Sequence, residues 1–541
     1  MAIEHVVVLC LENRSFDHML GYLDHPDPSF TGLRTGGPYE NPGADGQPVA
    51  AAPGAKRVLP FGPDHSHNAV MAQLGVTGRG TQRRCSNAGF VASYEAKADG
   101  RGPGGAGGLI PWLRAHLRPK PPSAPRTTGR GPLIMLCQDP ERIPVLATLA
   151  LQFAVFDRWF CSVPGETWPN RNYLHAATSN GETDIEPRFY TDPTIFELLE
   201  AHGSTWHIYH DDTPQVWAFP HLWDTPERHA NWYPTTRFAD HARAGTLPTY
   251  SFIEPNHKPP FHTLDHTPEF GGAPDVSTSQ HPENNLVSNS AYDTFDDTGD
   301  TDFERGERLI ATIYEALRAN PELFARTLFL ITYDEHGGFY DHVSPPTDVP
   351  APGGGRRWLG QLIYDLQHHR SLPFDFRMLG PRVPAVVVSP LVEAGVVVHD
   401  VHEHASLPAT LRALFAPTAK PLTKRDAWAR PFHKVATRTE PRTDLPDLSA
   451  YASPAPAPAA AAAVAAPPAS EADAQVPDYY REFVAQADVV LAHLQQVGEP
   501  EVAGIGPTDT AERAEEISAA FAEAAHRHRA NPVSSKSRPA G

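Results

Sequence analysis

Continuous apolar runs are the feature of this sequence that most restricts its fold. The runs, rich in β-branched residues, lie at residues 3–11, 205–209, 249–253, 327–333 and 383–389. A strand that is apolar at nearly every position must be covered on both faces, as in a parallel sheet between two layers of helices. Helical patterns separate these runs, at residues 143–153, 194–202, 303–319 and 407–415. The alternation predicts an α/β fold with a mainly parallel central sheet flanked by helices.

The composition changes abruptly near residue 445. Residues 1–445 hold all of the alternating pattern, and their long Gly- and Pro-rich stretches predict loops that wall a pocket at the carboxyl ends of the strands. Residues 446–476, rich in Ala, Pro and Ser, predict a semi-rigid linker. Residues 477–530 predict a helical C-terminal extension that docks elsewhere or mediates oligomerisation, and residues 531–541 predict a disordered tail.

The charge of the chain restricts its partners. Its net charge of -19 argues against a nucleic-acid partner, because nucleic-acid-binding surfaces are basic. A phosphate-bearing substrate is not excluded, since a bound metal ion can reverse the local field. The first apolar run has no basic segment before it, and no run is long enough to span a membrane. We therefore expect a cytoplasmic protein, with leaderless secretion left open.

Acidic side chains follow two of the predicted strands directly. Glu12 and Asn13 follow the first run, while Asp334 and Glu335 follow the run at 327–333 and precede a Gly-Gly turn. Carboxylate and amide oxygens suit a hard or borderline divalent cation, and two acids at a buried strand end need a compensating charge. The alternatives are turn or capping residues for the first pair and surface carboxylates for the second.

A third segment offers a nucleophile. Thr167 precedes a turn and is followed by Arg171 in the first part of a possible helix. A threonine hydroxyl becomes a nucleophile once it loses its proton, which metal coordination promotes. The alternative is that Thr167 only caps the helix.

Histidines are the fourth group, with 28 in the chain and many of them in predicted loops. His65 and His281 lie in such loops, and the glycines after Glu335 would return His342 towards the strand ends. Histidines that converge on one pocket can donate hydrogen bonds to phosphoryl oxygens or protonate a leaving alkoxide. The alternative for each one is a surface position.

The order of these segments resembles a phosphoesterase family that contains bacterial phosphatidylcholine-type phospholipases C and acid phosphatases. The segments that carry the resemblance are Glu12-Asn-Arg-Ser-Phe-Asp-His-Met-Leu-Gly21, Thr167-Trp-Pro-Asn-Arg171, Asp334-Glu-His-Gly-Gly-Phe-Tyr-Asp-His342 and Leu379-Gly-Pro-Arg-Val-Pro-Ala-Val-Val-Val-Ser-Pro390, with shorter matches at 251–256, 280–282 and 404–406. The resemblance spans residues 3–418. It implies an alkaline phosphatase/sulfatase-like core and makes residues 1–445 a phosphoesterase catalytic domain.

The resemblance also implies a site and a reaction. The implied ligands of one divalent metal ion (Ca, Mg, Mn, Fe or Zn) are Glu12, Asn13, Thr167, Asp334 and Glu335, and the implied catalytic residues are Thr167, His65, His281 and His342. His257 is a weaker candidate for the pocket. The implied activity is phospholipase C-type cleavage of phosphodiester lipids through a phospho-threonine intermediate. The alternatives are an acid phosphatase that acts on phosphomonoesters and a non-catalytic binding protein that keeps the fold.

Overall fold

The computed structural model describes residues 2–43, 45–98, 129–185, 189–210, 214–257, 277–353 and 374–452. The predicted helical extension, the predicted tail and the linker beyond residue 452 lie outside the described residues, as do parts of the Gly- and Pro-rich loops.

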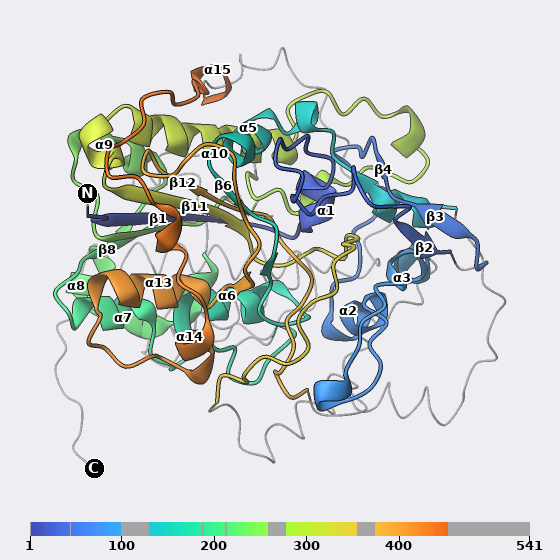
Figure 1. The fold of residues 1–541 in the computed structure, drawn as a ribbon, viewed down its shortest axis with the longest axis horizontal. Helices are drawn as coiled ribbons and strands as arrows, with labels where there is room; N and C mark the ends of the chain where they lie inside the picture. The colour runs from blue at the N-terminus through green and yellow to red at the C-terminus, as the bar shows by residue number, and fades with distance from the viewer. Residues whose placement is uncertain are drawn as a thin grey trace, which may run out of the picture.

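An eight-stranded sheet forms the centre of the domain (Figure 1). Its strands in spatial order are β13 (Val396–Val398), β6 (Ala154–Phe156), β12 (Ala385–Val388), β11 (Thr327–Tyr333), β1 (His5–Leu11), β10 (Tyr250–Ile253), β8 (Trp206–Tyr209) and β9 (Trp232–Tyr233). All neighbours pair in parallel except β12, which is antiparallel to both β11 and β6. The predicted α/β class with a mainly parallel sheet is confirmed, and each of the five apolar runs contains a strand.

The two central strands explain where polar residues collect. Residues Val6 to Leu11 of β1 and all of β11 are buried, because helices cover both faces of the sheet. Leu9 of β1 pairs with Ile331 of β11 on one side and with Ile253 of β10 on the other. The three strands therefore end at nearly the same level, and the residues that follow them emerge at one edge of the sheet.

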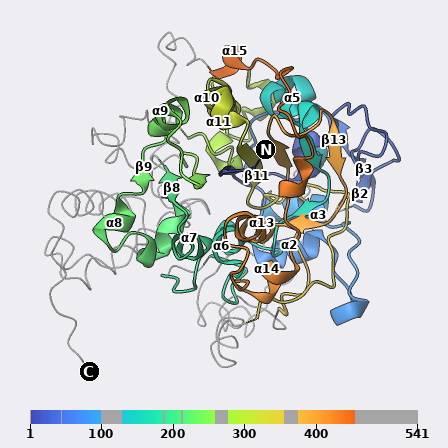
Figure 2. The same cartoon turned by 60° about the vertical axis from the view of Figure 1, so that its left-hand side comes forward.

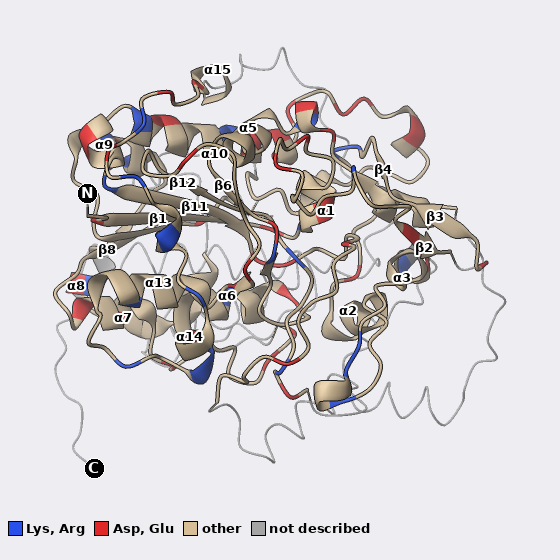
Figure 3. Cartoon of the chain, viewed as in Figure 1, with Lys and Arg blue, Asp and Glu red and all other residues tan. Residues whose placement is uncertain are grey.

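Helices cover the sheet in two layers, one above it and one below it in Figure 1, and the turned view in Figure 2 keeps them apart. The upper layer contains α5 (Pro144–Gln152), α9 (Thr236–Ala244) and α10 (Asp302–Arg318), and the lower layer contains α6 (Thr167–Ala176), α7 (Ile195–Glu200), α13 (Ser406–Phe415) and α14 (Lys424–Trp428). The side chain of Thr301 caps α10 by accepting the N–H of Glu304. Among the described helices, none combines the length and apolar character needed to cross a bilayer. Lys and Arg are interspersed with Asp and Glu along the described chain (Figure 3).

The packed domain extends past residue 445. The last helix of the described residues is α15 (Ser449–Ala452), which lies against α10. The hydroxyl of Tyr314 donates to the carbonyl of Pro446 (2.8 Å), and the N–H of Leu448 donates to Glu315 (2.7 Å). Leu448 is buried against the core. The composition of residues 446–452 predicts a linker. In the structure these residues pack against the domain, because Leu448 is buried in its core.

Glu307 of α10 joins this helix to α5 and makes the stability of the fold depend on pH. Its carboxylate accepts the N–H groups of Val145 (2.8 Å) and Leu146 (3.2 Å) at the start of α5. Burial raises the pKa of Glu307 to about 7, although these N–H groups oppose the rise. An unfolded Glu has a pKa of about 4.3, so between about pH 4 and pH 7 the unfolded state ionises first and the folded state loses relative stability as pH rises.

We expect Glu307→Gln to raise the free energy of unfolding at pH 8 by about 1–3 kcal/mol, because the amide keeps an acceptor and never ionises. The gain should shrink to near zero by about pH 4.5. Urea denaturation at both pH values measures it, and Glu304→Gln on the same helix is the control. An equal gain at both pH values would contradict the burial argument.

Candidate active site

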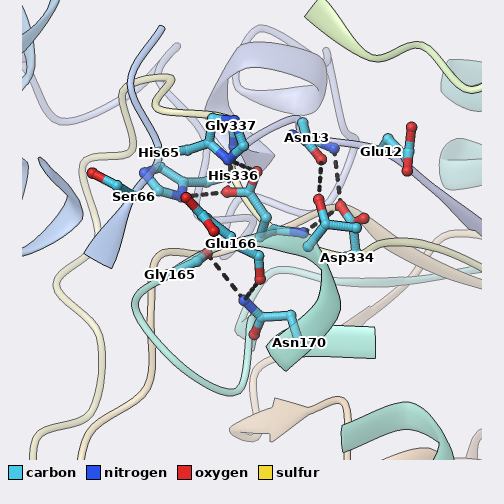
Figure 4. A network of polar contacts seen from close by, with 12 residues as sticks. Glu12, Asn13, His65, Ser66, Gly165, Glu166, Asn170, Asp334, His336 and Gly337 are labelled. Carbon is cyan, nitrogen blue, oxygen red and sulfur yellow. Dashed lines mark hydrogen bonds and ion pairs between the residues drawn. The ribbon is translucent and has the colours of Figure 1, made fainter. Parts of the chain in front are cut away.

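Five polar side chains meet where the central strands end. Glu12 and Asn13 follow β1, Glu254 follows β10, and Asp334 and Glu335 follow β11, and all five are buried. The carboxylate of Asp334 accepts the N–H of Asn13 (3.0 Å) and that of Glu335 (2.7 Å), so the loops after β1 and β11 are tied together (Figure 4). Parallel strands in register bring these distant residues to one place.

Two unusual backbone positions allow the close approach of these loops. Asn13 has a φ of 57°, in the left-handed region that Asn tolerates better than most residues. Gly337 has a φ of 63°, and a Cβ there would lie 2.0 Å from the carbonyl oxygen of Asn13. The Gly-Gly turn after Glu335 is therefore required by contact with the loop that carries Asn13.

Helix α6 places Thr167 at this cluster. Glu166 is the cap residue and Thr167 is the first helical residue, so the interpretation of Thr167 as the helix cap is wrong. The hydroxyl of Thr167 donates to Oδ1 of Asn13 (3.3 Å). The amide of Asn170 donates to the carbonyls of Gly165 (3.2 Å) and Glu166 (3.1 Å), which shapes the turn before the helix (Figure 4). The positive N-terminal end of α6 thus faces the carboxylates, where an anionic phosphoryl group would also be favoured.

Arg171 and Glu254 are site residues to which the sequence reasoning assigned no role. Arg171 is fully buried and donates to Asp334 (3.0 Å), to Glu12 (3.4 Å) and to Glu254. Burial alone would lower the pKa of Arg171, but the carboxylates of Glu254 and Asp334 hold it well above its usual value. Arg171 lies four residues after Thr167 and so on the same helix face, and Glu254 ends a strand as Glu12 does. Both signals were present in the sequence.

Several described histidines contact the cluster, among them His336, whose Nδ1 lies 3.1 Å from Oε2 of Glu335, and three of the histidines named from the sequence. Nδ1 of His65 lies 3.1 Å from Oε1 of Glu335, and Nε2 of His257 lies 3.1 Å from Oε1 of Glu12. The side-chain amide of Asn13 lies 2.9 Å from Nε2 of His281. The structure therefore brings His65 and His281 to the predicted ligands, and it brings His257 there as well.

His342 lies in a different network. Its Nδ1 is 2.6 Å from Asp17, and its ring packs on Tyr39. Asp17, Asp341 and His342 are close enough to share a metal ion, but the buried guanidinium of Arg382 already contacts Asp17 and Asp341 at 2.8 Å each. Arg382 supplies the positive charge there, and none of the contacts described for His342 reaches the strand-end cluster.

The charges of the strand-end cluster favour a bound cation. Burial raises the pKa of Asp334 to about 7; Arg171 opposes the rise, and Glu12 and Glu335 add to it. Burial would also raise the pKa of Glu12, but His257 and Arg171 hold it well below its usual value. Oε2 of Glu12 is buried without a hydrogen-bond partner among the described residues. Carboxylate and amide oxygens, with a buried carboxylate oxygen that no described hydrogen bond satisfies, fit a hard divalent ion.

The fold and the site define an α/β enzyme whose polar residues gather at the carboxyl ends of parallel strands. The model of the Phosphoesterase family matches residues 3–416. The chain belongs to this family and is a hydrolase that acts on phosphoric ester bonds.

Similar proteins carry phospholipase C names. Non-specific phospholipase C3 of Arabidopsis thaliana is 33% identical, over 82% of this chain and 75% of the plant protein. Non-hemolytic phospholipase C of Burkholderia pseudomallei is 27% identical, over 84% of this chain and 62% of that protein. A solved protein of the alkaline phosphatase superfamily from Vibrio parahaemolyticus matches with 11% identity and a TM-score of 0.26, over 50% of this chain and 60% of that one.

Proposed function

We propose that the protein is a phospholipase C-type hydrolase that cleaves phosphodiester lipids through an intermediate on Thr167. The observation that carries the proposal is the position of the Thr167 hydroxyl, at the start of α6 and 3.3 Å from Asn13 in the carboxylate cluster. The phospholipase C names of the relatives support a lipid diester as the substrate.

In the proposed reaction, Oγ of Thr167 attacks phosphorus and the bond from phosphorus to the lipid alkoxide breaks. A protonated histidine gives its proton to that alkoxide, while the proton of the Thr167 hydroxyl passes to solvent. Water then hydrolyses the threonine ester: its oxygen bonds to phosphorus and one of its protons restores the Thr167 hydroxyl. The histidine regains its proton from solvent. The N-terminal end of α6 stabilises charge on the phosphoryl oxygens. Of the predicted pocket histidines, His65 and His281 contact the cluster; His257 joins them in this proposal in place of His342.

Glu12, Asn13, Asp334 and Glu335, together with Thr167, would hold one divalent metal ion. When bound, the ion would lower the pKa of the Thr167 hydroxyl and offset negative charge on the phosphoryl group. The ion would also compensate the carboxylates that Arg171 leaves unbalanced.

We expect kcat/KM for phosphatidylcholine to exceed that for para-nitrophenyl phosphate by about tenfold or more, because a lipid diester offers more groups to bind than a small monoester. Released phosphocholine and released nitrophenol are the measurements. Dialysis against a chelator should abolish both activities, and one added divalent ion should restore them. Elemental analysis of the untreated protein gives the metal content.

The outcomes separate the alternatives. Faster turnover of the monoester would assign an acid phosphatase instead. Activity that survives complete metal removal would overturn the metal proposal. A protein without activity on either ester, and without bound metal, would be a binding protein that keeps the fold.

A further inference from the structure

Gln280 adopts a backbone conformation that its residue type does not favour. It is fully buried and has a φ of 67°. The left-handed region costs a residue with a Cβ about 1–2 kcal/mol, so the surrounding structure must hold Gln280 there. Gln280 directly precedes His281, one of the histidines at the strand-end cluster.

The side chain of Gln280 is held at both ends of its amide. The hydroxyl of Tyr333, the last residue of β11, donates to its oxygen, and its Nε2 donates to the carbonyl of Phe303 in α10 (2.9 Å). The side chain of Gln280 packs directly against Gly306 of α10, in a notch that exists because glycine has no Cβ. A Cβ at residue 306 would lie 2.4 Å from Cγ of Gln280. A glycine inside an α-helix lowers the stability of the helix by about 1 kcal/mol relative to alanine. The contact with Gln280 explains why a glycine stands at this position of α10.

The main chain of this loop is tied to the loop after β1. Nε of Arg14 donates to the carbonyl of Gln280 (2.9 Å), and the N–H of Glu12 donates to the carbonyl of Ser279 (3.0 Å). Arg14 is itself buried, with its guanidinium over the rings of Phe303 (5.1 Å) and Phe339 (4.9 Å). The ends of β1 and β11 and helix α10 therefore all hold Gln280.

The conformation of Gln280 decides where the His281 ring points. Nδ1 of His281 accepts the N–H of Glu283 (3.1 Å), so the ring is pinned to the turn that follows it. Because Nδ1 is fixed by this hydrogen bond, the direction of Nε2 depends on the backbone conformation of the preceding residue, Gln280. In the observed conformation Nε2 lies 2.9 Å from Nδ2 of Asn13, the residue whose side-chain oxygen accepts the Thr167 hydroxyl.

We propose that Gln280 is a positioning residue that aims Nε2 of His281 at the reacting phosphoryl group. The inference rests on the proposed function, in which His281 is one of the histidines of the pocket that binds the phosphoryl group. Gln280 touches no substrate; it acts through His281 alone.

Two substitutions disturb Gln280 in different ways. Gln280→Gly keeps the left-handed backbone accessible and removes both amide anchors. Gly306→Ala favours the helix but places a methyl group where Cγ of Gln280 lies, so the anchored side chain must leave its notch. Thr312→Ala, at an exposed position of the same helix, is the matched control.

Each substitution is made in the wild type and in His281→Ala, and kcat, KM and thermal stability are measured on one phosphoester. We expect His281→Ala to lower kcat by about 100-fold, as for loss of one donor to a developing charge. Gln280→Gly and Gly306→Ala should each lower kcat by about tenfold with KM within about twofold, and both effects should vanish in His281→Ala. The thermal midpoints of both variants show whether a lower kcat comes from partial unfolding.

The two backgrounds distinguish the possible failures. If either substitution lowers kcat as much in His281→Ala as in the wild type, Gln280 has a general structural role and the inference is overturned. If neither lowers kcat in the wild type, it is overturned as well, while the proposed function stands. If His281→Ala itself keeps full activity, the assignment of His281 falls and the inference falls with it. Should one of the two variants not fold, the other gives the same comparison.

Discussion

Thr167→Ala should fold as the wild type does and should hydrolyse phosphoesters about 10⁴-fold more slowly or worse, because the attacking oxygen is gone. The loss of structure should be small. Thr167 is the first residue of α6, and its hydroxyl makes one hydrogen bond of 3.3 Å, to Asn13. Steady-state turnover and circular dichroism measure the two expectations.

Two further measurements sharpen this test. Thr167→Ser keeps the hydroxyl and should retain a substantial part of the activity. Rapid acid quenching of the wild type during turnover should leave a phosphoryl adduct on the peptide that contains Thr167, and mass spectrometry should find none in Thr167→Ala. Near-normal turnover by Thr167→Ala would show that another group, or water, attacks phosphorus.

Arg171→Met should destabilise the protein by about 3–5 kcal/mol, because it leaves buried carboxylates without their counter-charge. Arg171 contacts Glu12, Glu254 and Asp334, and all four side chains are at most 4% exposed. Urea denaturation of the metal-free protein measures the effect. We also expect turnover to fall, since the ion pairs hold the predicted metal ligands in place.

A second substitution tests the physical cause of that loss. Removing one of the unbalanced charges with Glu254→Gln should recover part of the stability of Arg171→Met, whereas Glu254→Gln alone should destabilise the protein. Arg237→Met, at an exposed ion pair on α9, should change stability by no more than about 0.5 kcal/mol. Equal losses for Arg171→Met and Arg237→Met would mean that the cluster does not depend on the guanidinium.

The strand ends were the part of the site that could be predicted. Glu12 and Asp334 each follow a continuous apolar run, and parallel strands with flanking helices must deliver such residues to one edge. Glu254 obeys the same rule, because it follows the apolar run at residues 249–253. The position of His342 could not be predicted in this way. Gly337 and Gly338 let the chain turn sharply, but they do not specify the direction of the turn. In the structure the His342 ring contacts Asp17.

The sequence by itself determined the α/β class, the central strands and the acidic residues that end them, because these follow from local patterns of burial and from chain order. Only the tertiary structure decided which loop residues meet them. Gln280, Arg14 and His257 lie in loops without periodicity, and their partners are far away in the chain. Their positions depend on packing between separate elements, such as the notch over Gly306, and no local pattern encodes such a contact.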